Sequence, residues 1–147
     1  MKVGVVGLGY VGLPLAVAFA EEGHEVLGLD ADPRKIDALA EGRSYIEDVS
    51  SERLAALDGR LSATSRYPDL SECDAVIICV PTPLTNSREP DLSYMVDAAG
   101  SLAAVLRKGQ LIVLESTTYP GTTRERLRPI LEESGLLTTF TSSQTRE

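Results

Sequence analysis

The chain has 147 residues, a length typical of a single domain that can bury a sizeable core. Its net charge is −8 and its pI is near 4.7, which argues against a nucleic-acid-binding surface and leaves no basic patch for an anionic membrane. Two cysteines do not make a disulfide framework, and we expect a cytoplasmic protein without a metal site.

The first 30 residues predict a strand, a glycine-rich turn, a helix and a second strand. An apolar run over residues 3–6 leads into Gly7-Leu8-Gly9-Tyr10-Val11-Gly12, followed by small helix-forming residues. In this pattern Gly7 permits a sharp turn, Gly9 lets a pyrophosphate approach the backbone, and Gly12 allows close packing of helix on strand. The amino terminus of the helix suits an anion, so the pattern predicts a dinucleotide site.

The second strand, residues 25–29, ends in Asp30, near the spacing expected for an acid that binds the adenosine ribose. A carboxylate there favours NAD over NADP, and Arg34 tempers this preference because an arginine can accommodate a 2′-phosphate. The alternative is an export signal, since residues 3–20 are uncharged. Glycines and Pro14 make that stretch a poor continuous helix, which disfavours the alternative.

Short elements follow. Asp32 and Pro33 read as the cap and first residue of a helix that ends at Gly42, while His24 is expected to be a solvated turn residue. Residues 50–57 predict a small helix, and residues 61–64 predict a weak third strand.

The next strand, residues 74–80, is continuously apolar, as in a parallel strand covered on both faces, and Cys79 within it is expected to be buried and inert. It runs into Val80, Pro81 and Thr82 at its carboxyl end, where ligands bind in open α/β sheets. Thr82 has a functional interpretation there and a plain turn interpretation, of which the first is favoured.

The last third repeats the strand and helix alternation. Asp91 is expected to cap an amphipathic helix that closes at Gly109, and a strand over residues 110–114 then delivers Ser116 and Thr117 to the same edge. Thr122 and Glu125 have the spacing of a capping box for a final helix. Pro129 should kink or shorten that helix, and Gly135 should stop it.

These elements predict an α/β fold of the Rossmann type, with a doubly wound, mostly parallel sheet in one domain. The ends of the strands after residues 2, 25, 74 and 110 should gather around one crevice.

Four motifs give the chain a resemblance to a known family. They are Val6-Gly7-Leu8-Gly9-Tyr10-Val11-Gly12-Leu13-Pro14, Val80-Pro81-Thr82-Pro83, Asp91-Leu92-Ser93-Tyr94 and Glu115-Ser116-Thr117-Thr118-Tyr119-Pro120-Gly121-Thr122. In this order they resemble the amino-terminal, NAD-binding domain of the UDP-glucose/GDP-mannose dehydrogenase family. The wording around residues 83–94 is most similar to the UDP-N-acetylglucosamine 6-dehydrogenase branch.

The resemblance implies an activity in polysaccharide biosynthesis. Family members oxidise the C6 alcohol of a nucleotide sugar, here a UDP-sugar, to a carboxylate with two NAD, through an enzyme-bound thiohemiacetal and thioester. It implies that Thr117 helps to position a catalytic water. It also implies a cofactor site made of Gly7, Gly9, Tyr10, Val11, Gly12, Asp30, Arg34, Val80, Pro81, Thr82, Ser116 and Thr117.

The resemblance covers residues 1–136. The nucleophilic cysteine, the catalytic lysine and the sugar-nucleotide domain of the family lie beyond the length of this chain, and neither Cys73 nor Cys79 matches the nucleophile motif. Residues 137–147 are rich in Ser and Thr and predict a disordered tail outside the family pattern, from a truncated or frame-shifted coding sequence or an expression artefact. We therefore expect NAD binding without turnover.

Two other functions stay open. A stand-alone nucleotide-sensing module would need the crevice but not Thr82, Ser116 and Thr117. A β-hydroxyacid dehydrogenase is disfavoured by the residues between Tyr10 and Pro14. A domain without its partner domain exposes an apolar surface and a sheet edge, so we expect self-association as a homo-oligomer.

Overall fold

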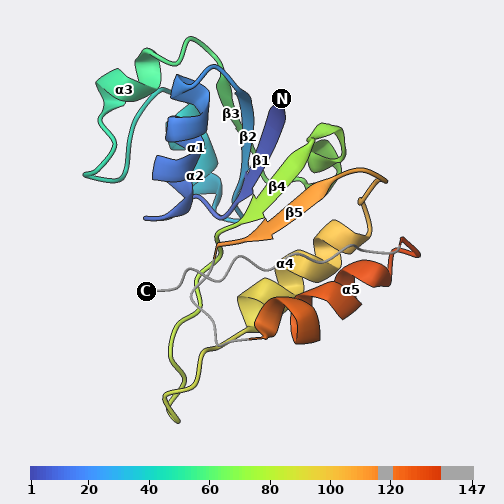
Figure 1. Ribbon diagram of the computed structural model, residues 1–147. Helices are drawn as coiled ribbons and strands as arrows, with labels where there is room; N and C mark the ends of the chain where they lie inside the picture. The colour runs from blue at the N-terminus through green and yellow to red at the C-terminus, as the bar shows by residue number, and fades with distance from the viewer. Residues whose placement is uncertain (116–120, 137–147) are drawn as a thin grey trace.

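The computed structural model describes residues 1–115 and 121–136, and within them a five-stranded sheet forms the centre. All strand pairs are parallel, in the order β3-β2-β1-β4-β5 (Figure 1). The strands are β1 Lys2–Val6, β2 Glu25–Leu29, β3 Leu61–Thr64, β4 Ala75–Ile78 and β5 Leu111–Leu114. The expected doubly wound, parallel sheet is confirmed.

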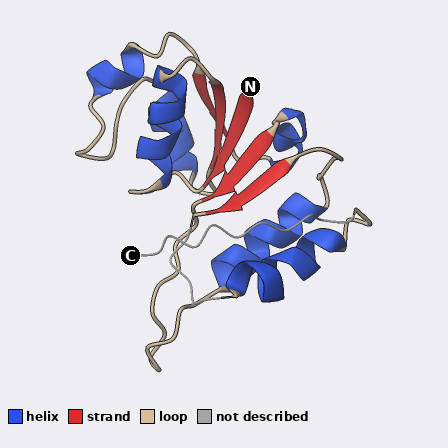
Figure 2. Ribbon diagram, viewed as in Figure 1, coloured by secondary structure: helices blue, strands red, loops and turns tan. Residues whose placement is uncertain are grey.

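Helices cover both faces of this sheet. The helices α1 (Gly12–Glu21) and α2 (Pro33–Ala40) lie on one face, with the short α3 (Ser51–Ala55) beyond them. On the other face lie α4 (Ser93–Ala103) and α5 (Arg128–Glu132), as Figure 2 shows. A 3-10 helix, η1 (Tyr67–Glu72), follows β3, and a π-helix, η2 (Thr123–Leu127), precedes α5.

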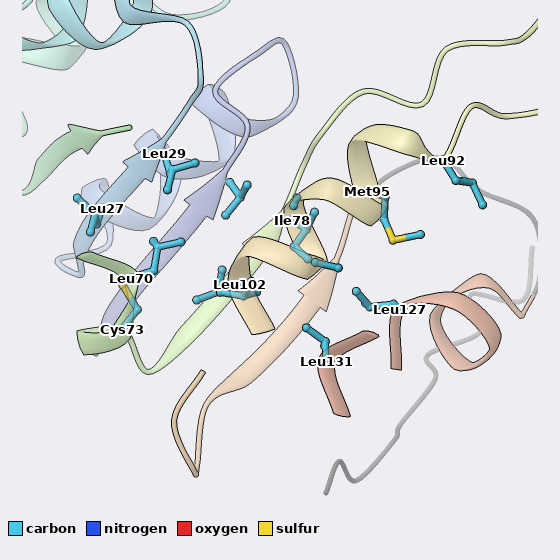
Figure 3. Packing of buried hydrophobic residues seen from close by; sticks show 14 residues of the cluster. Leu27, Leu29, Leu70, Cys73, Ile78, Leu92, Met95, Leu102, Leu127 and Leu131 are labelled. Atoms are coloured by element: carbon cyan, nitrogen blue, oxygen red, sulfur yellow. The ribbon is translucent and has the colours of Figure 1, made fainter. Parts of the chain in front are cut away.

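Each face has its own apolar core. Val3, Val5 and Val26 face α1, whereas Val6, Val76 and Ile78 face α4. This split follows from the alternation of side chains along each strand, so both faces of the sheet must be covered. In Figure 3 Met95 and Leu102 of α4 lie among Ile78, Leu127 and Leu131, the side chains that hold α4 and α5 on the sheet.

The register aligns the carboxyl ends of the strands. Val6 lies opposite Leu29 on one side and Ile78 on the other, and Ile78 lies opposite Leu114. The segments that follow these strands therefore start at one edge. Because the chain order reverses at β1, between β2 and β4, this edge contains the crevice where α/β sheets bind ligands.

Several local predictions are confirmed. Asp32 caps α2 by accepting a hydrogen bond from the Arg34 N–H at 2.9 Å, with Pro33 as the first helical residue. Ser50 caps α3 by accepting one from the Arg53 N–H at 3.1 Å. His24 lies in the expected turn after α1, but it is only partly exposed because its ring packs beside Phe19.

The helix after Asp91 is shorter than expected. Asp91 does accept a hydrogen bond from the Ser93 N–H, but α4 ends at Ala103 and not at Gly109. The segment that follows is held by other contacts: Arg107 donates to the Ser71 and Cys73 carbonyls, and Gln110 donates to those of Leu70 and Cys73. These bonds tie the turn before β5 to the end of η1, which fixes it outside the helix.

The predicted capping box at Thr122 and Glu125 is wrong. Thr122 has helical dihedrals and makes no side-chain cap hydrogen bond, while the Glu125 N–H bonds to the Gly121 carbonyl at 2.8 Å. The chain therefore already turns helically at Thr122 and continues as a π-helix. Pro129 does not interrupt the helical backbone, which continues from the π-helix into α5 at Arg128. Proline is tolerated there because it lies in the first turn of α5, where a missing N–H costs little.

Candidate functional site

The glycine loop between β1 and α1 has a backbone that only glycine can form at two positions. Gly7 has φ +93°, and a Cβ there would lie 2.8 Å from the Cys79 carbonyl oxygen. A Cβ on Gly12 would lie 1.6 Å from the Gly7 carbonyl oxygen. The first and third glycines therefore shape the loop itself and press it against β4.

Gly9 differs from both. A Cβ built on Gly9 would meet nothing within 4 Å. The fold does not need glycine at this position, so the space above Gly9 is available to a ligand that approaches the backbone.

The amino terminus of α1 adds an anion-binding feature to this loop. Its N-cap is Val11, no side chain caps the helix, and its first turn has no acidic residue. The helix start therefore relies on no protein side chain to satisfy its N–H groups, which suits a pyrophosphate. Tyr10 and Val11 are 81% and 57% exposed beside it, where a bound dinucleotide would cover them. The residues present fit the phosphates of NAD.

Asp30 lies at the end of β2 and is held in place by the loop. Its carboxylate accepts hydrogen bonds from the N–H groups of Leu8 and Asp32, both at 2.9 Å. The side chain is only 13% exposed. A carboxylate has about four acceptor positions, so Asp30 can still accept hydrogen bonds from ribose hydroxyls.

The two basic residues of α2 point in different directions. The Arg34 guanidinium donates to both oxygens of Asp32, at 3.1 and 3.0 Å, and is 90% exposed. This pairing lowers the pKa of Asp32 and keeps it ionised. Lys35 instead lies with its Nζ 3.5 Å from Asp30. Arg34 therefore faces away from Asp30, and Lys35 is the cation beside it.

Tyr45 secures the same loop from the side of α2. Its hydroxyl donates to the Leu8 carbonyl at 2.6 Å, and the Lys35 ammonium lies 5.9 Å from its ring centre. Burial and the nearby carboxylates of Asp30 and Asp32 raise the pKa of Tyr45. The phenol stays protonated and keeps donating to the loop.

A cavity of about 420 Å³ opens beside these residues. Among the predicted cofactor residues it is lined by Gly7, Asp30, Val80 and Pro81. Thr82 follows at the same edge and is half-buried. Ser116 and Thr117 lie outside the described residues. The other lining residues are Val6, Leu29, Ala31, Lys35, Ser65, Tyr67, Tyr94, Asp97, Ala98 and Ser101.

Cys79 lies under the glycine loop. It is buried, as expected, with its Cβ 3.3 Å from the position of a Cβ on Gly12. Burial raises the pKa of its thiol to about 11, so it is neutral near pH 7. A neutral buried thiol is a poor nucleophile. This agrees with the expectation from the sequence that Cys79 is buried and unreactive.

Sequence reasoning missed Lys35, Tyr45 and the cavity face of α4. The first two depend on side-chain direction, which no motif gave. The third had a signal, because Tyr94, Asp97, Ala98 and Ser101 recur at helical spacing opposite the apolar stripe. In the part of the chain that the structure describes, no cluster of acidic, His and Cys side chains could hold a metal ion, and no helix has the length and apolar character to cross a bilayer.

Comparisons with known proteins agree on one family of dehydrogenases. The model of the UDP-glucose/GDP-mannose dehydrogenase family, NAD binding domain, matches residues 1–142, and so includes residues 137–142. A UDP-N-acetyl-D-glucosamine 6-dehydrogenase of Pseudomonas aeruginosa is 43% identical over 137 residues, 92% of this chain and 32% of that protein.

Solved structures show the same relation. A ternary complex of GDP-mannose dehydrogenase from Pseudomonas aeruginosa superposes with a TM-score of 0.89 at 32% identity, covering 93% of this chain and 33% of that one. A UDP-D-ManNAc dehydrogenase from Pyrococcus horikoshii superposes with a TM-score of 0.87 at 40% identity, covering 94% and 34%. The chain thus spans about a third of the length of the relatives it matches.

Proposed function

The chain belongs to the UDP-glucose/GDP-mannose dehydrogenase family and forms its NAD binding domain, and we propose that it is the cofactor-binding part of a UDP-sugar 6-dehydrogenase. The parent reaction oxidises the C6 alcohol of a UDP-sugar to a carboxylate with two NAD. The nicotinamide supplies the hydride acceptor when the cofactor is bound.

One observation carries the proposal. The uncapped start of α1, the open space above Gly9 and the Asp30 carboxylate lie at one edge of the sheet, in the order that phosphates and ribose require. Asp30 is anchored by two backbone N–H groups and is therefore held ready for the ribose hydroxyls.

We propose the following roles for the site residues. Gly7, Gly9, Tyr10, Val11 and Gly12 surround the pyrophosphate. Asp30 binds the ribose, with Lys35 rather than Arg34 as the neighbouring cation. Val80, Pro81 and Thr82 complete the crevice among the described residues, and the family resemblance assigns cofactor contacts to Ser116 and Thr117 as well.

Chemistry at the sugar depends on groups outside this chain. By the family resemblance Thr117 orients the catalytic water, and a neutral hydroxyl can do this without acting as a base. Neither Cys73 nor Cys79 matches the nucleophile motif of the family. We infer that the part of the protein given by these 147 residues contributes NAD binding.

We also propose a cytoplasmic location and self-association for this protein. Cys73 and Cys79 are free, which is typical of a reducing compartment such as the cytoplasm. Within the described residues β5 pairs only with β4, and Leu111 on it is 60% exposed. An unpaired edge with an exposed apolar residue favours self-association.

A chimera tests the enzymatic part. Residues 1–136 would replace the matching segment of the Pseudomonas aeruginosa relative, and NADH formation would be followed with UDP-N-acetylglucosamine. We expect NAD-dependent oxidation that a Gly9→Ala version of the chimera loses. A folded chimera that binds NAD but oxidises no UDP-sugar would contradict the proposed function.

A further inference from the structure

One face of α4 is turned toward the cofactor cavity and differs from the rest of the helix. Tyr94, Asp97, Ala98 and Ser101 line the cavity, whereas Met95, Ala99 and Leu102 are buried in the core below. Ala98 is 4% exposed and small, so it leaves a shallow floor between longer neighbours. Such a floor accommodates a flat ring.

The walls of the cavity differ chemically. Asp30 and Lys35 line it beside the glycine loop, where phosphates and ribose are expected. Asp97 and Ser101 line it from α4. Val6, Leu29 and Val80 contribute apolar wall. A nucleotide whose ribose is bound by Asp30 therefore has room for its base in a cavity that α4 helps to enclose.

Tyr67 is near both acidic residues of the cavity. It is half-buried and lines the cavity after β3. Burial raises the pKa of Tyr67, and the negative charges of Asp30 and Asp97 raise it further. The phenol thus lies in the field of both carboxylates.

Asp97 is exposed and differs from three other aspartates, Asp30, Asp32 and Asp91. Asp30, Asp32 and Asp91 each accept a backbone hydrogen bond. Within the described residues Asp97 accepts no hydrogen bond and forms no ion pair. Its acceptor capacity is available to a ligand.

We propose that Asp97 reads the base of the bound dinucleotide by accepting a hydrogen bond from the exocyclic amino group of adenine. This inference rests on the proposed function and adds a specificity determinant to the same site. Adenine carries an amino group at C6 that donates hydrogen bonds. Hypoxanthine carries a carbonyl oxygen at C6, which a carboxylate repels. The chain therefore prefers NAD⁺ to its hypoxanthine analogue.

The test is the ratio of two dissociation constants, for nicotinamide hypoxanthine dinucleotide and for NAD⁺, measured by calorimetry on the whole chain. For the unmodified chain we expect a ratio of about 10, the size of one partly exposed charged hydrogen bond. Asp97→Asn should bring the ratio to about 1, because the amide can rotate to donate to the hypoxanthine oxygen. Asp37→Asn, at an exposed position of α2 outside the cavity, is the matched control and should leave the ratio unchanged.

The ratio separates base reading from general charge effects. Removing a negative charge near an anionic ligand strengthens both complexes equally and leaves the ratio constant. A ratio that Asp97→Asn does not change, with NAD⁺ still bound, overturns the role of Asp97 and leaves the proposed function intact. Failure of the unmodified, folded chain to bind either dinucleotide overturns both.

Discussion

At the scale of the residue, Gly9 and Gly12 differ in why the position requires glycine: Gly12 is required by the loop backbone, and Gly9 leaves room for a ligand. An added methyl at Gly9 meets only open space, while the same methyl at Gly12 overlaps the Gly7 carbonyl oxygen. A substitution at Gly9 should therefore weaken ligand binding, whereas a substitution at Gly12 should destabilise the fold.

We predict that Gly9→Ala lowers NAD⁺ affinity at least about tenfold and leaves the thermal midpoint unchanged. Gly12→Ala should cost about 3 kcal/mol or more of unfolding free energy, because the clash is with backbone. Calorimetry for binding and denaturant unfolding for stability measure the two effects. If Gly9→Ala bound NAD⁺ with normal affinity, the phosphates would not bind in the space above this residue.

The neighbours Arg34 and Lys35 offer a second comparison. Lys35 lies beside Asp30 in the cavity, and Arg34 pairs with Asp32 outside it. Lys35→Ala should weaken NAD⁺ binding about fivefold, the size of one partly exposed charge interaction. Arg34→Ala is the matched control and should change it less than about twofold. A larger loss of NAD⁺ affinity in Arg34→Ala than in Lys35→Ala would instead place Arg34 beside the bound ribose.

At the scale of the element, Tyr45 ties the segment after α2 to the glycine loop. Tyr45→Phe should lower the unfolding free energy by about 1 kcal/mol near pH 7 through the lost bond to Leu8. Tyr10→Phe is the control, because Tyr10 is 81% exposed.

The same phenol has a consequence for pH. The folded state holds the Tyr45 proton more tightly than the unfolded chain, whose tyrosines titrate near pH 10. The stability it contributes is therefore complete below about pH 10 and is lost as the pH rises further. Tyr67 and Cys79 act in the same direction. Tyr45→Phe should flatten this alkaline loss in urea titrations, and an unchanged slope would assign the loss to the other groups.

The elements also show where sequence patterns suffice. Strand positions and the cap at Asp32 follow from apolar runs and local hydrogen bonding, so they could be predicted. The end of α4 could not, because long-range bonds from Arg107 and Gln110 to carbonyls of η1 decide it. The failed capping box at Thr122 has a similar cause, since the chain there is already helical.

For the site, the glycine spacing and Asp30 predict where the phosphates and the ribose bind, and the structure places these residues at one edge of the sheet because backbone geometry sets their positions. The distinction between Arg34 and Lys35 was out of reach, because the Asp32 cap captures the first of them. Tyr45 reaches Leu8 across 37 positions of sequence, a contact that no local pattern encodes.

At the scale of the whole molecule, β5 is an edge strand of the sheet among the residues that the structure describes. Leu111→Lys should reduce self-association, because a charge on an edge strand opposes pairing with another chain. Sedimentation velocity at increasing protein concentration would show a lower average mass for the variant. Equal masses at every concentration would place any assembly surface elsewhere.

Isothermal titration of this chain with NAD⁺, and separately with NADP⁺, would show whether it forms an NAD⁺ site. We expect a saturable isotherm for NAD⁺ and binding at least about tenfold weaker for NADP⁺, because the anchored Asp30 carboxylate repels a 2′-phosphate. A folded chain that binds neither dinucleotide would overturn the assignment of an NAD⁺ site.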